Sequence, residues 1–260
     1  MDERHRTSRR RALGILAAAA VSGSRGATAQ DPMTEPPHAP SRLAQNAVAE
    51  VDLDLVLGVD ASGSVNQRRF ELQRRGYVEA FMDPRVLAAV RSGPRAAVGV
   101  AMYQWTGPRL QIPVVPWTRI HDEATIRQFA DRIARADRHL FGGGTSISGA
   151  IDYGVFLLGE TPFDALRRVI DISGDGANNR GRPAVAARDE AVAAGINING
   201  LPILELEPDL EEHYRSNVIG GPGAFTIAAD TFDDFGNAIR RKLILEIAGR
   251  EIGPPMSGAA

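Results

Sequence analysis

The sequence predicts an α/β fold in which a doubly wound, mostly parallel sheet carries helices on both faces. Two observations predict it. Short apolar runs typical of buried strands alternate along the chain with segments whose apolar residues recur at helical spacing. Parallel strands need a long crossover, usually a helix, so this alternation is the expected signature of such a sheet. The 260 residues, 43% of them hydrophobic, are also enough for one large domain with a sizeable core.

The first strand and the first helix are the clearest elements. Residues 53–59 form a short apolar run, as expected of a strand that is buried on both faces. Residues 66–82 carry Phe70, Tyr77 and Phe81 at helical spacing, so they are expected to form a helix with one apolar side.

The next two strands are expected over Ala96 to Tyr103 and over Leu110 to Val115. Pro113 and Pro116 place the second of these at an edge of the sheet or in a hairpin, because proline cannot donate to a hydrogen-bonded ladder. Residues 122–136 are then expected to be helical, since their apolar side chains recur on one face.

A helix over residues 145–159 is indicated by one apolar stripe, made of Ile147, Ile151, Val155 and Leu158. The remaining elements continue the alternation. They are a strand at Arg168 to Ile172, a helix at 183–194 ended by Gly195, a strand at Ile196 to Leu204, a helix at 208–218, a strand at Ala224 to Ala228 and a helix at 231–248. In a sheet of this kind, ligands bind at the carboxyl ends of the strands, where the strand order reverses.

Composition excludes several functional classes. The formal net charge of −2 leaves no basic excess for binding nucleic acid. The chain has no cysteine, which excludes disulfides, thiolate metal sites and cysteine nucleophiles. Its only lysine is Lys242, so chemistry that needs a lysine earlier in the chain is excluded as well.

Residues 1–29 are typical of an export signal. Ser8-Arg9-Arg10-Arg11-Ala12-Leu13 resembles the twin-arginine signal, with an ordinary secretory signal as the alternative. The apolar stretch at 12–22 is far short of the roughly 20 residues that a membrane span needs. Ala27-Thr28-Ala29 is a small-x-small cleavage site. Cleavage after Ala29 would remove six arginines and two acids, and would leave a mature chain of net charge near −6 in the periplasm or outside the cell.

The mature chain is expected to have three parts. Residues 30–49 are a proline-rich linker, residues 50–248 form the α/β domain, and residues 249–260 are a flexible tail. No stretch of the mature chain is apolar and long enough for a transmembrane segment. The sequence leaves the oligomeric state open.

Three polar loops follow predicted strands or open a predicted helix. Asp60-Ala61-Ser62-Gly63-Ser64 comes directly after the first strand, and its alternate residues can point to one side of an extended turn. Gly142-Gly143-Gly144-Thr145 lets the backbone approach closely and places Thr145 at the start of a helix. Ser173-Gly174-Asp175-Gly176 puts Asp175 at the carboxyl end of another strand.

These loops offer two carboxylates and three hydroxyls, which are oxygen donors that suit a hard divalent cation such as Mg²⁺ or Mn²⁺. The candidate ligands are Asp60, Ser62, Ser64, Thr145 and Asp175. If the neutral hydroxyls bind directly and the aspartates bind partly through water, the cation keeps residual positive charge. It would then favour an acidic group from a partner in its open position.

The constellation resembles the metal-ion-dependent adhesion site (MIDAS) of the von Willebrand factor A (vWA) domain, written Asp-x-Ser-x-Ser, then a threonine, then an aspartate. All five positions are filled here, and the resemblance covers roughly residues 50–248, element order included. It implies a Rossmann-like vWA fold. It also implies a non-enzymatic protein that binds a carboxylate of a partner protein through Mg²⁺ or Mn²⁺. Two departures are Ser-Gly-Asp-Gly, where Thr-Asp-Gly is common, and Tyr103-Gln104-Trp105, where small polar residues are usual.

Two other interpretations remain open. Asp, Ser, Gly and Thr are the residues that turns and helix caps use, so the loops would also suit a structural envelope protein without metal. Residues 174–179, Gly-Asp-Gly-Ala-Asn-Asn, resemble a loop of haloacid-dehalogenase-type phosphatases, in which Asp60 would be the nucleophile. That family's second aspartate in Asp-x-Asp is missing here, and so is its lysine. The acidic stretch from Glu205 to Glu212 is interpreted as a solvated helix start.

Overall fold

A computed structural model describes residues 48–249 of the chain. The export signal, its cleavage site, the tail beyond Gly249 and most of the linker expected from the sequence lie outside these residues. The first strand begins at Ala49, close to the expected start of the domain. Within residues 48–249, no helix is both long and apolar enough to cross a membrane.

Five strands form one sheet in the order β3-β2-β1-β4-β5. Their bounds are β1 (Ala49–Asp60), β2 (Val98–Trp105), β3 (Gln111–Ile120), β4 (Phe163–Gly174) and β5 (Asn197–Pro202). All neighbours pair in parallel except β3, which lies antiparallel to β2 at one edge. The doubly wound, mostly parallel sheet predicted from the sequence is confirmed, and so is the edge position of the strand that contains Pro113 and Pro116.

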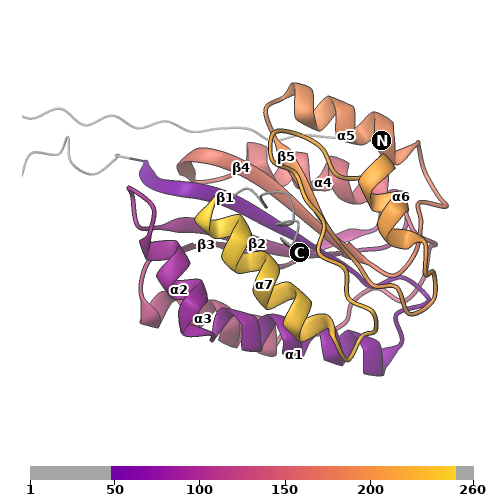
Figure 1. Cartoon of the computed structure of the whole chain (residues 1–260), viewed down its shortest axis with the longest axis horizontal. Coiled ribbons are helices and arrows are strands. Elements are labelled where there is room, and N and C mark those ends of the chain that lie inside the picture. The colour runs from indigo at the N-terminus through magenta and orange to yellow at the C-terminus, as the bar shows by residue number, and fades with distance from the viewer. Residues whose placement is uncertain (1–47, 250–260) are drawn as a thin grey trace, which may run out of the picture. The chain divides into compact units, whose positions relative to one another are not determined.

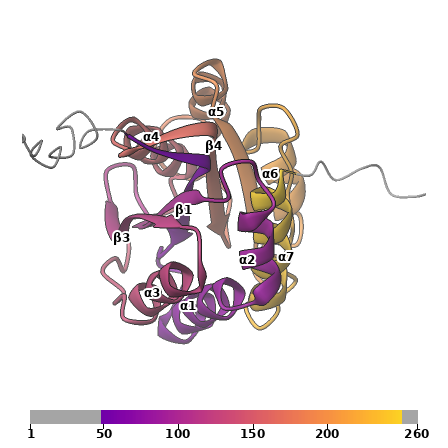
Figure 2. The same ribbon diagram turned by 90° about the vertical axis from the view of Figure 1, so that its left-hand side faces the viewer.

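Helices cover both faces of the sheet. One face carries α1 (Gln67–Phe81), α2 (Pro84–Arg91), α3 (Glu123–Ala134) and α7 (Phe235–Ala248), and the other carries α4 (Ile147–Gly159), α5 (Ala184–Ala193) and α6 (Leu210–Asn217). Figure 1 shows α7 lying beside α1 and α2 across the sheet. Figure 2 gives the view turned by 90° from that of Figure 1. It shows α1, α3 and α7 on the face of the sheet opposite α4 and α5.

The sheet separates two hydrophobic cores, which explains the apolar character of its central strand. Alternate residues of β1, such as Leu53, Leu55 and Leu57, pack into the core beneath α1 and α7. Val56 points the other way, into the core beneath α4 and α5. A strand that is buried on both faces needs apolar residues at successive positions, which is the pattern seen in the sequence.

The structure corrects the sequence prediction at the segment Ala224 to Ala228, which is not a strand of the sheet. This segment forms one bridge to β5, from Thr226 to Gly200, and a second bridge, from Ala229 to Ile203, lies just beyond both segments. It follows a tight turn in which Gly221 and Gly223 adopt positive φ angles. The turn brings the chain back beside β5 at isolated points, so no continuous ladder forms.

Other boundaries move for local reasons. β2 begins at Val98 rather than at Ala96, because Ala96 lies in a turn with a φ of 48°. β4 begins at Phe163 rather than at Arg168. The sequence did not indicate its first half, because exposed and half-buried residues alternate there and several of them are charged. The short helix α2 was not predicted, although Asp83 caps it and Pro84 opens it.

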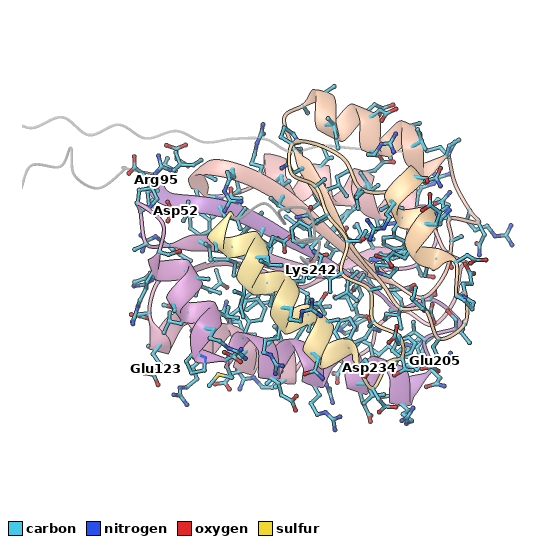
Figure 3. All side chains as sticks on the ribbon, in the orientation of Figure 1. Asp52, Arg95, Glu123, Glu205, Asp234 and Lys242 are labelled. Atoms are coloured by element: carbon cyan, nitrogen blue, oxygen red, sulfur yellow. The ribbon has the colours of Figure 1, made fainter. Side chains whose placement is uncertain are left out.

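A buried polar cluster joins α7 to the sheet. The ammonium group of Lys242 lies 2.7 Å from Asp171 of β4 and 3.2 Å from Glu246, one turn further along α7. Glu246 also accepts a 2.6 Å hydrogen bond from Asn199 of β5. All four side chains are almost completely buried. Figure 3 labels Lys242 midway along α7, in front of the sheet. The only lysine of the chain is therefore a structural ion-pair partner.

Candidate metal centre

The first loop begins where β1 ends. Asp60 is the last residue of β1 and is fully buried. Its Oδ1 accepts a 2.7 Å hydrogen bond from the backbone N–H of Ser62, which bends the chain into a tight turn. The hydroxyls of Ser62 and Ser64 lie 3.1 Å apart. Asn66 then caps α1, so the whole loop is held between a strand end and a helix start.

The third loop meets the first one because β4 lies next to β1 in the sheet. Asp175 follows the last residue of β4 and is almost fully buried. Its Oδ1 accepts a 2.6 Å hydrogen bond from the hydroxyl of Ser64. The strand order reverses between β1 and β4, which is where a doubly wound sheet opens a crevice for ligands.

The second loop brings in Thr145. Its backbone N–H donates to Oδ1 of Asn179 at 2.9 Å, and its carbonyl accepts from the N–H groups of Asn179 and Arg180. Gly143 and Gly144 adopt φ angles of 113° and 82°, which favour glycine. The helix cap is Ser146 and not Thr145, so Thr145 lies just before α4 instead of beginning it, with its side chain not used as a cap.

Four of the five predicted residues line one hollow of about 290 Å³, namely Ser62, Ser64, Thr145 and Asp175. The glycines at 142–144 form another wall of this site hollow. Asp60 lies beneath it and is joined to it through Ser62. The structure therefore brings all five predicted residues together around one place at the carboxyl ends of β1 and β4.

Both carboxylates have raised pKa values, as expected of buried acids that lie close together. Burial raises the pKa of Asp60 from its ordinary 3.8 to about 7, and the negative charge of Asp175 adds to the rise. Burial also raises the pKa of Asp175, although the hydrogen bond from Ser64 opposes this change. A divalent cation would offset both effects, because it supplies positive charge where the carboxylates have lost water.

Two buried carboxylate oxygens that lack a hydrogen-bond donor within residues 48–249 indicate that these residues suit a cation. The Oδ2 atoms of Asp60 and Asp175 are both buried, and neither has a hydrogen-bond partner among the described residues. Buried carboxylate oxygens without a donor are costly unless something else satisfies them. In residues 48–249, no place gathers three or more His, Asp or Glu side chains for a metal ion. A cation here would therefore need the hydroxyl donors, and the donor set fits a hard divalent ion.

Several residues of the site were missed by sequence reasoning. Glu207 lines the site hollow and accepts a 3.0 Å hydrogen bond from the N–H of Ala177. The sequence showed Glu207 only as part of an acidic stretch interpreted as a helix start, and α6 in fact begins three residues later, at Leu210. Asn179 lies in the same stretch of sequence as Asp175. Its hydrogen bond to Thr145 could not be predicted, because that bond depends on how the two loops meet in the fold.

A second missed group surrounds the buried side of Asp60. A Cβ atom at Gly174 would lie 3.0 Å from Asp60 Oδ2, 3.0 Å from the Tyr214 hydroxyl and 3.1 Å from the Trp105 ring. The Tyr214 hydroxyl and the Trp105 Nε1 are also buried without a partner among the described residues. Gly174 therefore leaves room for these polar groups around the carboxylate of Asp60. No sequence pattern indicates this, because the three residues come from different elements.

Comparison with known proteins adds the following findings. A family model described as "Protein of unknown function (DUF1194)" matches residues 50–251. None of the curated protein sequences compared matches the chain. Among solved structures, the chain is similar to proximal thread matrix protein 1 (PTMP1) from the mussel byssus "with zinc occupied MIDAS motif". The TM-score is 0.54 at 15% identity, over 77% of this chain and 47% of that chain.

Two further structures are similar. A von Willebrand factor type A protein from Catenulispora acidiphila gives a TM-score of 0.51 at 14% identity, over 78% of this chain and 44% of that one. The pilus adhesin SpaC from Lactobacillus rhamnosus GG in its open conformation gives 0.54 at 15% identity, over 78% and 31%. This chain thus spans less than half the length of each of these structures. At such identities the likeness concerns the fold, which is the one that the sequence resemblance implied.

Proposed function

The chain belongs to the DUF1194 family and has the fold of a vWA domain, and from this premise we propose that it is an exported, cation-dependent binding protein. It holds Mg²⁺ or Mn²⁺ in the site hollow and uses the cation to bind a carboxylate of a partner protein. One observation carries the proposal: two buried carboxylates, each with one unpartnered oxygen, lie with three hydroxyls at the ends of two neighbouring strands.

The three neutral hydroxyls and the two carboxylates have different roles in holding the cation. Ser62, Ser64 and Thr145 bind the cation directly, while Asp60 and Asp175 bind it directly or through water. Neutral hydroxyl ligands do not cancel the charge of the cation, so it keeps an affinity for a further anionic oxygen. A carboxylate from a partner is the common biological group that supplies one. The likeness to a byssus protein with a zinc-occupied MIDAS and to a pilus adhesin supports this role.

Export follows from residues 1–29. Their arginine-rich start, short apolar stretch and small-x-small site are typical of a cleaved signal, here of the twin-arginine type. The mature chain then works in the periplasm or outside the cell, where adhesive contacts between proteins are made.

A phosphatase role is not favoured by the site. Asn178 and Asn179, which carry the resemblance to a phosphatase loop, have structural roles: Asn178 accepts from the N–H of Ser148 and Asn179 from that of Thr145. The only lysine is buried in the ion-pair cluster on α7 and cannot offset the charge of a phosphoryl group. We therefore propose binding without catalysis.

Thermal unfolding of the exported chain tests the proposal. A cation present at about 100 times its dissociation constant adds roughly 2.7 kcal/mol to the free energy of unfolding. For a domain of this size, such a gain raises the melting temperature by about 5–10 °C above its value in chelator. Ser62→Ala should abolish most of the rise. Ser216→Ala, which removes an exposed serine hydroxyl of α6, should keep it.

Calorimetric titration with Mg²⁺ and Mn²⁺ then measures cation binding directly and complements the shift in melting temperature. Binding to the unsubstituted chain and to Ser216→Ala, with loss in Ser62→Ala, supports the metal site. The metal site is disproved if neither ion binds to the unsubstituted chain, or if Ser62→Ala and Thr145→Ala bind as tightly as the control does.

A further inference from the structure

Large apolar side chains are exposed around the site hollow. Residues 48–249 contain seven exposed large hydrophobic residues, and three of them border this one place. Leu206 lines the hollow, Phe141 directly precedes its glycine wall, and Leu110 lies so close to Gly143 that a Cβ there would be 2.7 Å from Leu110 Cδ1. Their exposed fractions are 48%, 66% and 44%. We call Leu110, Phe141 and Leu206 the apolar rim.

The apolar rim differs from scattered surface hydrophobes because its three residues lie at or beside one polar hollow. Single exposed apolar residues are normal, but a group of them around a concave, polar centre is typical of an interaction surface. Phe141 is the most exposed of the seven and sits in the loop that contributes the glycine wall. It would remain costly to solvate unless a partner covered it.

Positive charge lies beside the apolar rim. The guanidinium of Arg138 lies 4.7 Å from the centre of the Phe141 ring and donates to the carbonyls of Ala61 and Ser62. Among the described residues, Asp60 is the carboxylate that acts on Arg138 electrostatically, and the Nε of Arg138 is buried without a hydrogen-bond partner. Arg138 thus fastens the Phe141 loop to the first site loop. Asp60 beneath the hollow attracts its charge without forming an ion pair, and this positive charge at the rim complements an acidic partner.

We propose that the apolar rim and Arg138 select the partner: the carboxylate that reaches the cation belongs to a segment in which large apolar residues flank an Asp or Glu. This inference rests on the proposed function and names the partner chemistry of the same site. The carboxylate approaches the hollow, the flanking apolar side chains cover Phe141, Leu110 and Leu206, and Arg138 adds attraction for the negative charge. A carboxylate on a polar, flexible segment would leave the apolar rim uncovered.

Short peptides of defined sequence test this inference. The probe is a fluorescent peptide, Gly-Leu-Phe-Glu-Leu-Leu-Gly, and its comparison peptide replaces the four apolar residues by serine. A third peptide replaces Glu by Gln. Fluorescence anisotropy with the Mg²⁺-loaded chain should give a dissociation constant at least fivefold lower for the apolar peptide than for the serine peptide, since a few buried side chains dominate such contacts. Binding of the Gln peptide should be lost.

Matched variants assign the effect to the apolar rim. Phe141→Ala and Leu206→Ala should each weaken the apolar peptide at least fivefold and leave the serine peptide unchanged. Phe156→Ala removes an equally large exposed ring from α4, 57% exposed, and should change neither. Arg138→Gln should weaken both Glu-containing peptides. Calorimetry should show that Phe141→Ala and Leu206→Ala bind Mg²⁺ as the unsubstituted chain does.

The failures can be told apart. If Mg²⁺ does not bind at all, the proposed function fails. If Mg²⁺ binds but the apolar and serine peptides bind equally, or if Phe141→Ala matches Phe156→Ala, only the inference about the partner fails. Concentration-dependent dimerisation that is lost in Phe141→Ala would assign the apolar rim to a second copy of the chain, and would overturn the assignment to an acidic segment.

Discussion

The hydroxyl of Ser64 donates a 2.6 Å hydrogen bond to Oδ1 of Asp175, although 111 positions separate the two residues in the chain. This bond joins the loop after β1 to the loop after β4. It therefore ties together the two strand ends at which the order of the sheet reverses. The same hydroxyl lies 3.1 Å from that of Ser62, so the bond also links the two serines of the first loop to the third.

Ser64→Ala should both destabilise the metal-free chain and weaken its affinity for Mg²⁺. The substitution leaves a buried carboxylate oxygen without its donor, which costs about 1–3 kcal/mol. Urea unfolding in chelator measures the first effect and calorimetry measures the second. Ser216→Ala is the matched control, because Ser216 also donates to a carboxylate, that of Glu212, but at the exposed surface of α6. Equal stability of the two variants would contradict the prediction.

The metal-free chain should become more stable as the pH falls from 8 to 6. The pKa of Asp60 is about 7 in the folded chain and about 3.8 when unfolded, so between these values the folded state holds a proton that the unfolded state has released. Stability from this group therefore falls as the pH rises toward 7. Each pH unit well inside this interval changes the free energy of unfolding by about 1.4 kcal/mol.

Asp60→Asn removes this titration, together with the charge that Asp60 exerts on Asp175. Burial also raises the pKa of Asp54, to about 6, and that of Asp171, to about 7, and both titrations act in the same direction. Subtracting the melting temperature of Asp60→Asn from that of the unsubstituted chain, both measured in chelator, removes the contribution that Asp54 and Asp171 make to both. This difference should shift in favour of the unsubstituted chain on acidification. A difference that stays constant from pH 8 to 6 would refute the assignment to Asp60.

Gly174→Ala should destabilise the chain by about 1–3 kcal/mol, as expected when an extra methyl group enters a packed interior. The new Cβ would lie within 3.1 Å of Asp60 Oδ2, the Tyr214 hydroxyl and the Trp105 ring. Because Asp60 would have to move, the affinity for Mg²⁺ should fall as well. Gly159→Ala is the control, since a Cβ at Gly159 meets no atom within 4 Å. Calorimetry and urea unfolding of both variants check the prediction.

Lys242→Met should cost about 3–5 kcal/mol, because it leaves the buried carboxylates of Asp171 and Glu246 without their cation. Arg241→Met, at the neighbouring but exposed position, should change the free energy of unfolding by less than about 0.5 kcal/mol. Adding Asp171→Asn and Glu246→Gln to Lys242→Met should recover part of the loss. Urea unfolding measures all of these variants, and a Lys242→Met chain as stable as Arg241→Met would contradict the ion-pair role.

Much of the fold follows from local pattern. The apolar run before Asp60 and the alternation of strands and helices predicted the sheet, and Pro113 and Pro116 predicted its antiparallel edge. These signals work because a central parallel strand must be apolar on both faces, while an edge strand tolerates proline. The segment Ala224 to Ala228 is apolar like a buried strand, but it pairs with β5 only through an isolated bridge. Local composition carries no information about how far such pairing extends.

The meeting of the five candidate residues at one end of the sheet was predictable from the sequence, but their surroundings were not. Asp60, Ser62, Ser64, Thr145 and Asp175 stand in loops at the ends of elements, so topology alone predicts that they meet. Glu207, Tyr214 and Trp105 reach the site from elsewhere in the fold, and their contribution depends on packing around Gly174 and Gly176. The raised pKa of Asp60 is likewise a product of burial, which no spacing of residues reveals.

The complete burial of Lys242 also makes the chain an unusual substrate for amine-directed reagents. With no other lysine in the sequence, the folded protein offers such a reagent its α-amino group and no accessible side-chain amine among the residues described. A single dye or surface tether can therefore be attached at the α-amino group without modifying a side chain of the site hollow. Lys242 can be acylated only when the packing between α7 and the sheet opens. The rate of its acylation therefore measures how often this part of the protein unfolds, and no engineered probe is needed.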